Sequence, residues 1–138
     1  MININDIKRV YLIGIGGIGM SGLARYFNQR GCLVYGFDKT VTPLTKELVN
    51  EGIGISYVDD SDLIPISFQN NDSETLIIYT PAIPQNSHIL NFFKKEHFEL
   101  YKRSQVLGII SNSMFCIAIA GTHGKTTTSS LVAHLLRE

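Results

Sequence analysis

The chain has 138 residues, of which 44% are hydrophobic and 17% are charged, and this composition is typical of a folded globular protein rather than a disordered one. Twelve Lys and Arg residues balance twelve Asp and Glu residues, so the chain lacks the basic excess that sequence-independent binding of nucleic acid needs. No polybasic run or long uninterrupted apolar stretch favours a membrane partner.

Strand and helix patterns alternate along the first half of the chain. In chain order they predict a strand at 7–13, a helix at 18–30, a strand at 33–37, a helix at 42–51 and a strand at 53–58. Gly31 is a typical helix end, and Thr42 followed by Pro43 is a typical helix start.

The alternation continues after a polar, turn-rich stretch at 59–72. In chain order we expect a strand at 75–79, a rigid loop at 80–84, a helix at 87–96, a strand at 98–101, a helix at 104–110, a strand at 114–120 and a helix at 125–136. Ser104 is expected to cap the helix that it begins.

This order of elements predicts an α/β fold, a Rossmann-like, doubly wound and mostly parallel sheet. We expect residues 1–108 to form that domain, and residues 109–138 to be the opening strand, phosphate loop and helix of a truncated second domain. Ligands of such sheets bind beyond the carboxyl ends of the strands. Gly14, Asp38, Thr80, Pro81 and the residues after Tyr101 are therefore expected along one rim.

The first glycine-rich loop, Gly14-Ile15-Gly16-Gly17-Ile18-Gly19, directly follows the first strand and opens a helix. In this G-x-G-x-x-G pattern the first glycine makes the tight turn, the second lets the backbone approach a pyrophosphate, and the third lets helix and strand pack closely. Asp38 stands 19 residues after Gly19, where an acid usually accepts hydrogen bonds from a ribose or similar hydroxyls. The loop therefore predicts a nucleotide diphosphate site, and the pattern alone leaves NAD, FAD and UDP-sugars open.

The second loop, Gly121-Thr122-His123-Gly124-Lys125-Thr126-Thr127-Thr128, is a shortened G-x-x-G-K-T phosphate cradle. Lys125 is expected to reach the β- and γ-phosphates of a nucleotide, and Thr126 to offer its hydroxyl to Mg²⁺. His123 lies inside the loop, and the pattern assigns it no role. Two different phosphate loops predict two phosphate-bearing ligands, and so a transfer or ligation reaction.

Three other features are less specific. The loop Thr80-Pro81-Ala82-Ile83-Pro84 either shapes a pocket wall or only turns the chain, and Arg103 either pairs with a phosphate or carboxylate or lies free on the surface. Cys32 and Cys116 are isolated in apolar stretches and are expected to be buried thiols. Free thiols are typical of a reducing compartment, so we expect the protein to be cytoplasmic.

The chain resembles the Mur ligases over nearly its whole length. The resemblance rests on residues 10–22 (VYLIGIGGIGMSG), Asp38, residues 80–83, Arg103 with Ser104, and residues 121–128 (GTHGKTTT), which occur in the order seen in that family. The second loop is similar to that of Mur ligases and folylpolyglutamate synthetases. The first loop with Met20-Ser21-Gly22 is most similar to the alanine-adding Mur ligases.

The resemblance implies an ATP-dependent, amide-forming ligase of peptidoglycan precursor synthesis. In that family the lactyl carboxylate of UDP-N-acetylmuramate is converted to an acyl phosphate, which the amine of L-alanine attacks. Lys125 and Thr126 would be catalytic, with Lys125 offsetting charge on the transferred phosphoryl group and Thr126 binding Mg²⁺. The implied UDP-sugar site is Gly14, Gly16, Gly17, Ile18, Gly19, Asp38, Thr80, Pro81, Ala82 and Arg103. The implied ATP site is Gly121, Thr122, His123, Gly124, Lys125, Thr126 and Thr127.

The family's metal-binding acid, adenine pocket and amino-acid-binding domain have no counterpart in these residues. We therefore expect this chain alone to be catalytically inactive but able to bind the UDP-sugar. A homodimer through the apolar side chains of residues 125–136 is a further expectation.

Three alternatives remain open: a ligase that attaches recycled murein peptide to the same sugar nucleotide, an NAD-dependent dehydrogenase domain, and a nucleotide-sensing domain. The last two leave the second loop without a use.

Overall fold

The sheet is built from five parallel strands. The computed structural model describes residues 2–113, and every structural statement below concerns those residues. The strands lie in the order β3-β2-β1-β4-β5, and each neighbouring pair is parallel. Their bounds are β1 (Arg9–Ile13), β2 (Leu33–Phe37), β3 (Gly54–Ser56), β4 (Thr75–Tyr79) and β5 (Leu100–Lys102).

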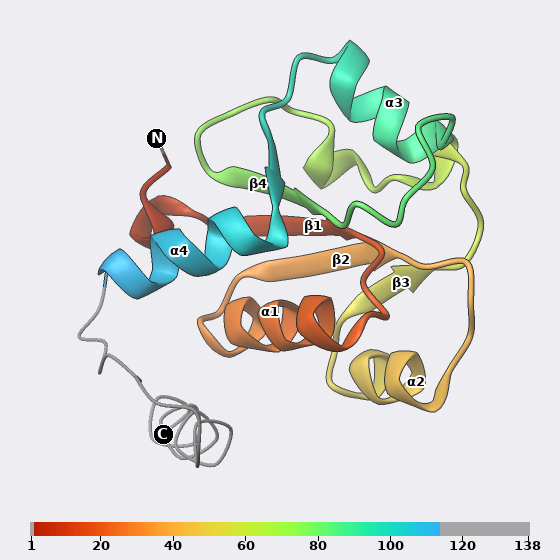
Figure 1. Ribbon diagram of the computed structural model, residues 1–138, viewed down its shortest axis with the longest axis horizontal. Coiled ribbons are helices and arrows are strands. Elements are labelled where there is room, and N and C mark those ends of the chain that lie inside the picture. The colour runs from red at the N-terminus through yellow and green to blue at the C-terminus, as the bar shows by residue number, and fades with distance from the viewer. Residues whose placement is uncertain (1, 114–138) are drawn as a thin grey trace, which may run out of the picture.

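Helices cover both faces of this sheet (Figure 1). The helices are α1 (Ile18–Gln29), α2 (Pro43–Asn50), α3 (His88–Lys95) and α4 (Arg103–Ser113), with the short 3-10 helices η1 (Ile4–Asp6), η2 (Ser61–Leu63) and η3 (Ile66–Phe68). In Figure 1, α1, α2 and α4 lie on one side of the sheet and α3 lies on the other. The domain is thus a three-layer α/β/α arrangement.

The side chains of β1 alternate between two hydrophobic cores. Val10 and Leu12 pack with Phe27 of α1 and Val106 of α4, among others, on one face. Tyr11 and Ile13 point to the opposite face, where they join a second cluster that includes Phe93 of α3. Because both faces of the strand are buried, its sequence is an unbroken apolar run rather than an alternating one.

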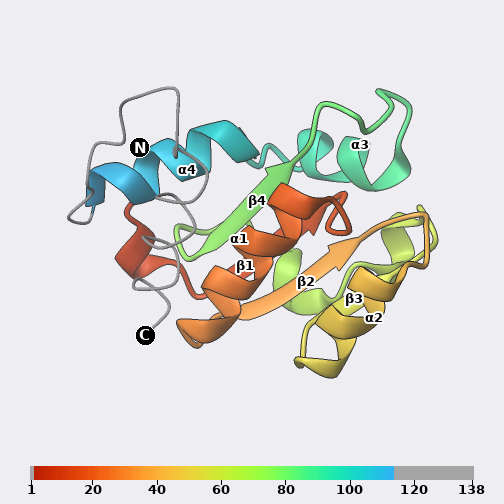
Figure 2. The ribbon, with the colours of Figure 1, turned by 60° about the horizontal axis from the view of Figure 1, so that its bottom comes forward.

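The chain crosses over at β1, which pairs with both β2 and β4. Figure 2 shows β1, β2 and β4 running toward the same edge of the sheet. In doubly wound sheets the crevice at such a reversal of strand order is where ligands bind. The fold therefore places the candidate site at the carboxyl ends of β1 and β4.

The predicted α/β fold is confirmed for the described residues, and the differences are local. The helix expected at 104–110 begins at Arg103 and runs to Ser113, so Ser104 lies inside the helix and is not its cap. The chain passes directly from β5 into α4, and the side chain of Gln105 accepts a hydrogen bond from the backbone N–H of Lys102 at 2.7 Å. The strand and helix expected at 114–120 and 125–136 lie outside the described residues.

Candidate functional site

A cleft of about 370 Å³ opens at the carboxyl edge of the sheet. Its lining residues come from the segments that follow four different strands, as the parallel topology requires. They are Gly14, Gly17 and Met20 after β1, Phe37, Asp38 and Lys39 at the end of β2, Asp59 after β3, and Thr80, Ala82, Ile83 and Pro84 after β4.

The glycine-rich loop reaches the cleft through backbone that a larger residue would not tolerate. Gly14 has a φ of 94°, a conformation that favours glycine, and a Cβ atom there would overlap the methyl group of Thr80. Its N–H donates to the carbonyl of Phe37 at 2.7 Å. The loop after β1 is therefore held between the ends of β2 and β4.

Asp38 binds the backbone of this loop. Its Oδ2 accepts a hydrogen bond from the N–H of Gly16 at 2.8 Å, and its Oδ1 accepts one from the N–H of Thr40 at 3.0 Å. A Cβ atom on Gly16 would lie 2.6 Å from that Oδ2 atom. Asp38 thus fixes the shape of the loop. The sequence predicted only a contact between this acid and a ribose or similar hydroxyls.

The amino end of α1 carries positive electrostatic character. Its N-cap residue is Gly17, which has no side chain to cap the helix, and no acidic residue lies in its first turn. The first N–H groups of a helix have no partner within the helix, so they and the helix dipole attract an anion.

Arg103 of α4 lies over this same turn. A Cβ atom on Gly19 would come within 2.7 Å of the Arg103 Nη1 and Cδ atoms. The third glycine of the motif is expected to let the helix pack closely on the strand. Here the absence of a side chain at Gly19 instead leaves space for the guanidinium group of Arg103. No ion pair joins Arg103 to a carboxylate among residues 2–113.

The structure brings together half of the predicted UDP-sugar residues. Gly14, Gly17, Asp38, Thr80 and Ala82 line the cleft. Gly16 contacts Asp38, Gly19 contacts Arg103, and Ile18 is 89% exposed beside them. Pro81 is exposed and does not line the cleft. The predicted ATP-site residues, 121–127, lie outside the described residues.

Sequence reasoning missed several cleft residues, notably Lys39 and Asp59. Lys39 directly follows Asp38, and Asp59 follows the third strand, so the rule that ligands bind beyond strand ends applied to both. The rule was applied only to the strands that end before Gly14, Asp38, Thr80 and residue 102, so the end of the third strand was not considered, although that strand ends at Ser56, three residues before Asp59.

A larger hollow of about 600 Å³ lies among residues near the starts of β1, β2 and β4. Its charged side chains neutralise one another: Arg9 pairs with Asp72 at 2.7 Å and with Glu74 at 3.6 Å, and Lys8 pairs with Glu74 at 3.2 Å. These pairs join the starts of β1 and β4 and leave that hollow without an unpaired charge to recruit a ligand.

One charged cleft residue, Asp59, also lies near enough to affect Tyr11 in the core. Burial, followed by the nearby Tyr35 and Asp59, raises the pKa of Tyr11 well above its ordinary value, so its hydroxyl stays protonated.

Among residues 2–113, no group of three His, Cys, Asp or Glu side chains lies close enough to hold a metal ion. No helix in that part of the chain is long and apolar enough to cross a membrane.

Comparison with known proteins agrees with this geometry. The family model described as Mur ligase family, catalytic domain, matches residues 9–114. A UDP-N-acetylmuramate–L-alanine ligase of Christiangramia forsetii is 49% identical over 138 residues, which are all of this chain and 30% of that relative. A ligase of the same name from Cytophaga hutchinsonii is 53% identical over 137 residues, 99% of this chain and 29% of the relative. The chain thus spans about 30% of the length of these relatives.

Solved structures share the fold. The UDP-N-acetylmuramate–alanine ligase MurC of Thermotoga maritima has a TM-score of 0.74 at 30% identity, over 94% of this chain and 29% of that one. The UDP-N-acetylmuramate:L-alanyl-γ-D-glutamyl-meso-diaminopimelate ligase of Neisseria meningitides has a TM-score of 0.73 at 26% identity, over 94% of this chain and 39% of that one. Fold, loop geometry and sequence agree, and the chain belongs to the Mur ligase family.

Proposed function

We propose that this chain is the UDP-sugar-binding part of a ligase that joins L-alanine to UDP-N-acetylmuramate in peptidoglycan precursor synthesis. Residues 1–108 would hold the sugar nucleotide, and residues 109–138 would begin the ATP-binding domain. The protein would act in the cytoplasm. The names of the relatives at 49% and 53% identity support the choice of L-alanine over a recycled peptide.

The observation that carries the proposal is the meeting of two positive groups beside the cleft. The uncapped amino end of α1 and the guanidinium of Arg103 approach the same turn, at Gly19. Asp38 accepts from the Gly16 N–H before this turn, but among residues 2–113 no carboxylate forms an ion pair with Arg103. Two positive groups placed together in this way are best explained by an anion that binds both, and a diphosphate is such an anion.

The remainder of the cleft suits the two ends of a sugar nucleotide. Phe37, Met20, Ile83 and Pro84 give it apolar walls, while Asp38, Lys39 and Asp59 supply polar atoms. Mixed walls of this kind are typical of small-molecule sites.

ATP with Mg²⁺ would supply the phosphoryl group that activates the carboxylate, and Lys125 and Thr126 are the residues proposed to bind them. The described residues would bind the UDP-sugar and orient its carboxylate. Since the chain spans about 30% of its relatives, we propose that it is inactive alone. Alanine-dependent ATP hydrolysis by this chain would contradict that.

The test is a calorimetric titration of the chain with UDP-N-acetylmuramate, with NAD as the parallel ligand. We expect the UDP-sugar to bind and NAD not to bind. Binding of NAD alone would overturn the proposal in favour of a dehydrogenase domain.

Arg103→Ala is the matching variant. Loss of one charge-assisted contact to the diphosphate should weaken binding about tenfold, the equivalent of about 1.4 kcal/mol. Lys95→Ala is the control, because it also removes one positive charge but lies at the last position of α3, which packs on the face of the sheet opposite to α1 and α4. Equal affinities for the two variants would remove Arg103 from the site.

A further inference from the structure

Asp59 lies in the short connection that leaves β3, and its carboxylate reaches across to the amino end of α3. Oδ1 accepts hydrogen bonds from the Ser87 hydroxyl at 3.0 Å and from the Ile89 N–H at 2.9 Å. Oδ2 accepts one from the His88 N–H at 3.2 Å. Three donors on three successive residues thus converge on one carboxylate that is 28 or more residues away in the sequence.

The helix does not need Asp59 to begin where it does. Ser87 is the N-cap of α3, and its side chain accepts from the N–H of Leu90. Ile89, Leu90 and Phe93 are buried against the sheet and hold the helix on its face. What Asp59 adds is a tie between the first turn of α3 and the end of β3.

That tie also fixes one wall of the cleft. The segment from Thr80 to Ser87 makes two consecutive turns, in which Ile83 donates to Thr80 and Ser87 donates to Pro84, each at 3.1 Å. Pro81 and Pro84 stiffen it further. Its near end is held where the N–H of Thr80 donates to the carbonyl of Ile13 at 3.3 Å, and its far end is held at Asp59.

The connection that carries Asp59 is itself braced. The hydroxyl of Ser56, the last residue of β3, donates to the carbonyl of Val58 at 3.1 Å and accepts from its N–H at 3.4 Å. Ser56 is buried. A rigid path therefore runs from β3 through Asp59 to the wall formed by Ala82, Ile83 and Pro84, and Asp59 lines the same cleft.

We infer that Asp59 is a positioning residue that fixes the place of the cleft wall formed by Ala82, Ile83 and Pro84. It thereby sets the affinity of the cleft for the sugar nucleotide. This inference rests on the proposed function only for the identity of the ligand. If loss of Asp59 leaves this wall correctly placed in only about one molecule in ten, the apparent affinity for the sugar nucleotide falls about tenfold.

The experiment compares Asp59→Ala with Asp60→Ala. Asp60 is the adjacent residue, carries the same charge and caps η2 through a 2.9 Å hydrogen bond to the Asp62 N–H, but does not line the cleft. We expect Asp59→Ala to bind UDP-N-acetylmuramate about tenfold more weakly than the unaltered chain, and Asp60→Ala to bind it equally well. Equal affinity of Asp59→Ala and the unaltered chain would overturn the inference.

A second measurement needs no ligand. The NMR amide signals of Ala82 and Ile83 should shift in Asp59→Ala and stay in place in Asp60→Ala. If the unaltered chain fails to bind the sugar nucleotide, the proposed function fails, while these signals still decide the role of Asp59. If Asp59→Ala does not fold, the same signals are read in Asp59→Asn, which keeps one acceptor oxygen; there unchanged signals would overturn the inference and shifted signals would support it.

Discussion

Gly16 lies where the loop after β1 meets two other elements. A Cβ atom there would lie 2.6 Å from Asp38 Oδ2 and 2.9 Å from Thr45 Cγ2. Neither neighbour moves freely, because Asp38 also accepts from Thr40, and Thr45 is part of the capping box of α2. The position therefore has no space for a larger side chain, whatever its backbone conformation.

Gly16→Ala should lower the free energy of unfolding by about 1–3 kcal/mol, the usual cost of overpacking. Gly22→Ala is the matched control, because Gly22 lies inside α1 and a Cβ atom there would meet nothing within 4 Å. That change should raise stability by about 0.5–1 kcal/mol, since alanine loses less entropy in a helix. Urea unfolding of both variants checks the pair, and equal midpoints would contradict this account of Gly16.

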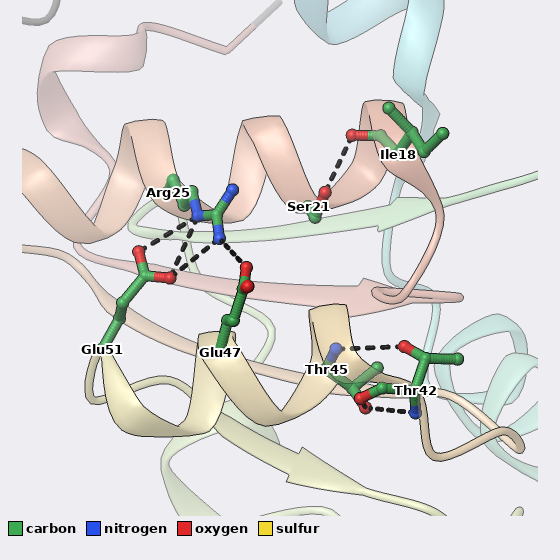
Figure 3. A network of polar contacts seen from close by, with 7 residues as sticks. All are labelled: Ile18, Ser21, Arg25, Thr42, Thr45, Glu47 and Glu51. Carbon is green, nitrogen blue, oxygen red and sulfur yellow. Dashed lines mark hydrogen bonds and ion pairs between the residues drawn. The ribbon is translucent and has the colours of Figure 1, made fainter.

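At the scale of elements, α2 packs against the glycine-rich loop through Thr45, which lies beside Gly16. An ion-pair network joins α2 to α1 (Figure 3). Arg25 donates to Glu51 through Nε at 3.0 Å and through Nη2 at 2.9 Å, and it donates to Glu47 at 3.2 Å. Thr42 and Thr45 close the other end of α2 with their reciprocal hydrogen bonds. The carboxyl end of α2 is thereby tied to α1, and the capping box stabilises its first turn.

Glu51→Gln should destabilise the fold more than Glu47→Gln, because Glu51 takes the bidentate contact. The Arg25 side chain is 33% exposed, so solvent screening should limit each loss to less than about 1 kcal/mol. Urea unfolding at low salt and in about 1 M NaCl measures both variants, and the difference between them should shrink at the higher salt. A larger loss for Glu47→Gln would show that the bidentate geometry carries little weight.

The same elements show what a sequence can and cannot predict. The expected strands at 33–37 and 75–79 match β2 and β4, because buried parallel strands are unbroken apolar runs. The strand expected at 53–58 is only Gly54–Ser56, since it lies at the edge of the sheet and Val58 is 59% exposed. The 3-10 helices within 59–72 escaped prediction because such short turns carry no hydrophobic period.

Part of the candidate site could likewise be predicted from the sequence, and part of it could not. The glycine-rich loop was predictable because strand, loop and helix are contiguous in the chain. The approach of Arg103 to Gly19 and the bonds from α3 to Asp59 join residues far apart in sequence, so no local pattern contains them. The predicted roles of the UDP-sugar residues stay predictions until ligand binding is measured.

For the whole molecule, the extent of the first domain is a question of packing. The boundary expected at residue 108 falls inside α4, which continues to Ser113. Val106 is fully buried and Ile110 is 8% exposed, and both belong to the core cluster that includes Phe27 and Leu76. The last turns of α4 therefore contribute to the same core as β1 and β4.

A chain ending at Ser113 should be more stable than one ending at Gly108. The shorter chain loses the buried side chain of Ile110, and truncation of a buried isoleucine typically costs about 2–5 kcal/mol. Thermal unfolding of the two chains measures the difference. A chain ending at Ser113 but carrying Ile110→Ala is the control, because it should lose most of the same stability while keeping the helix. Equal midpoints for the chains ending at Gly108 and Ser113 would place the end of the first domain before the last turns of α4.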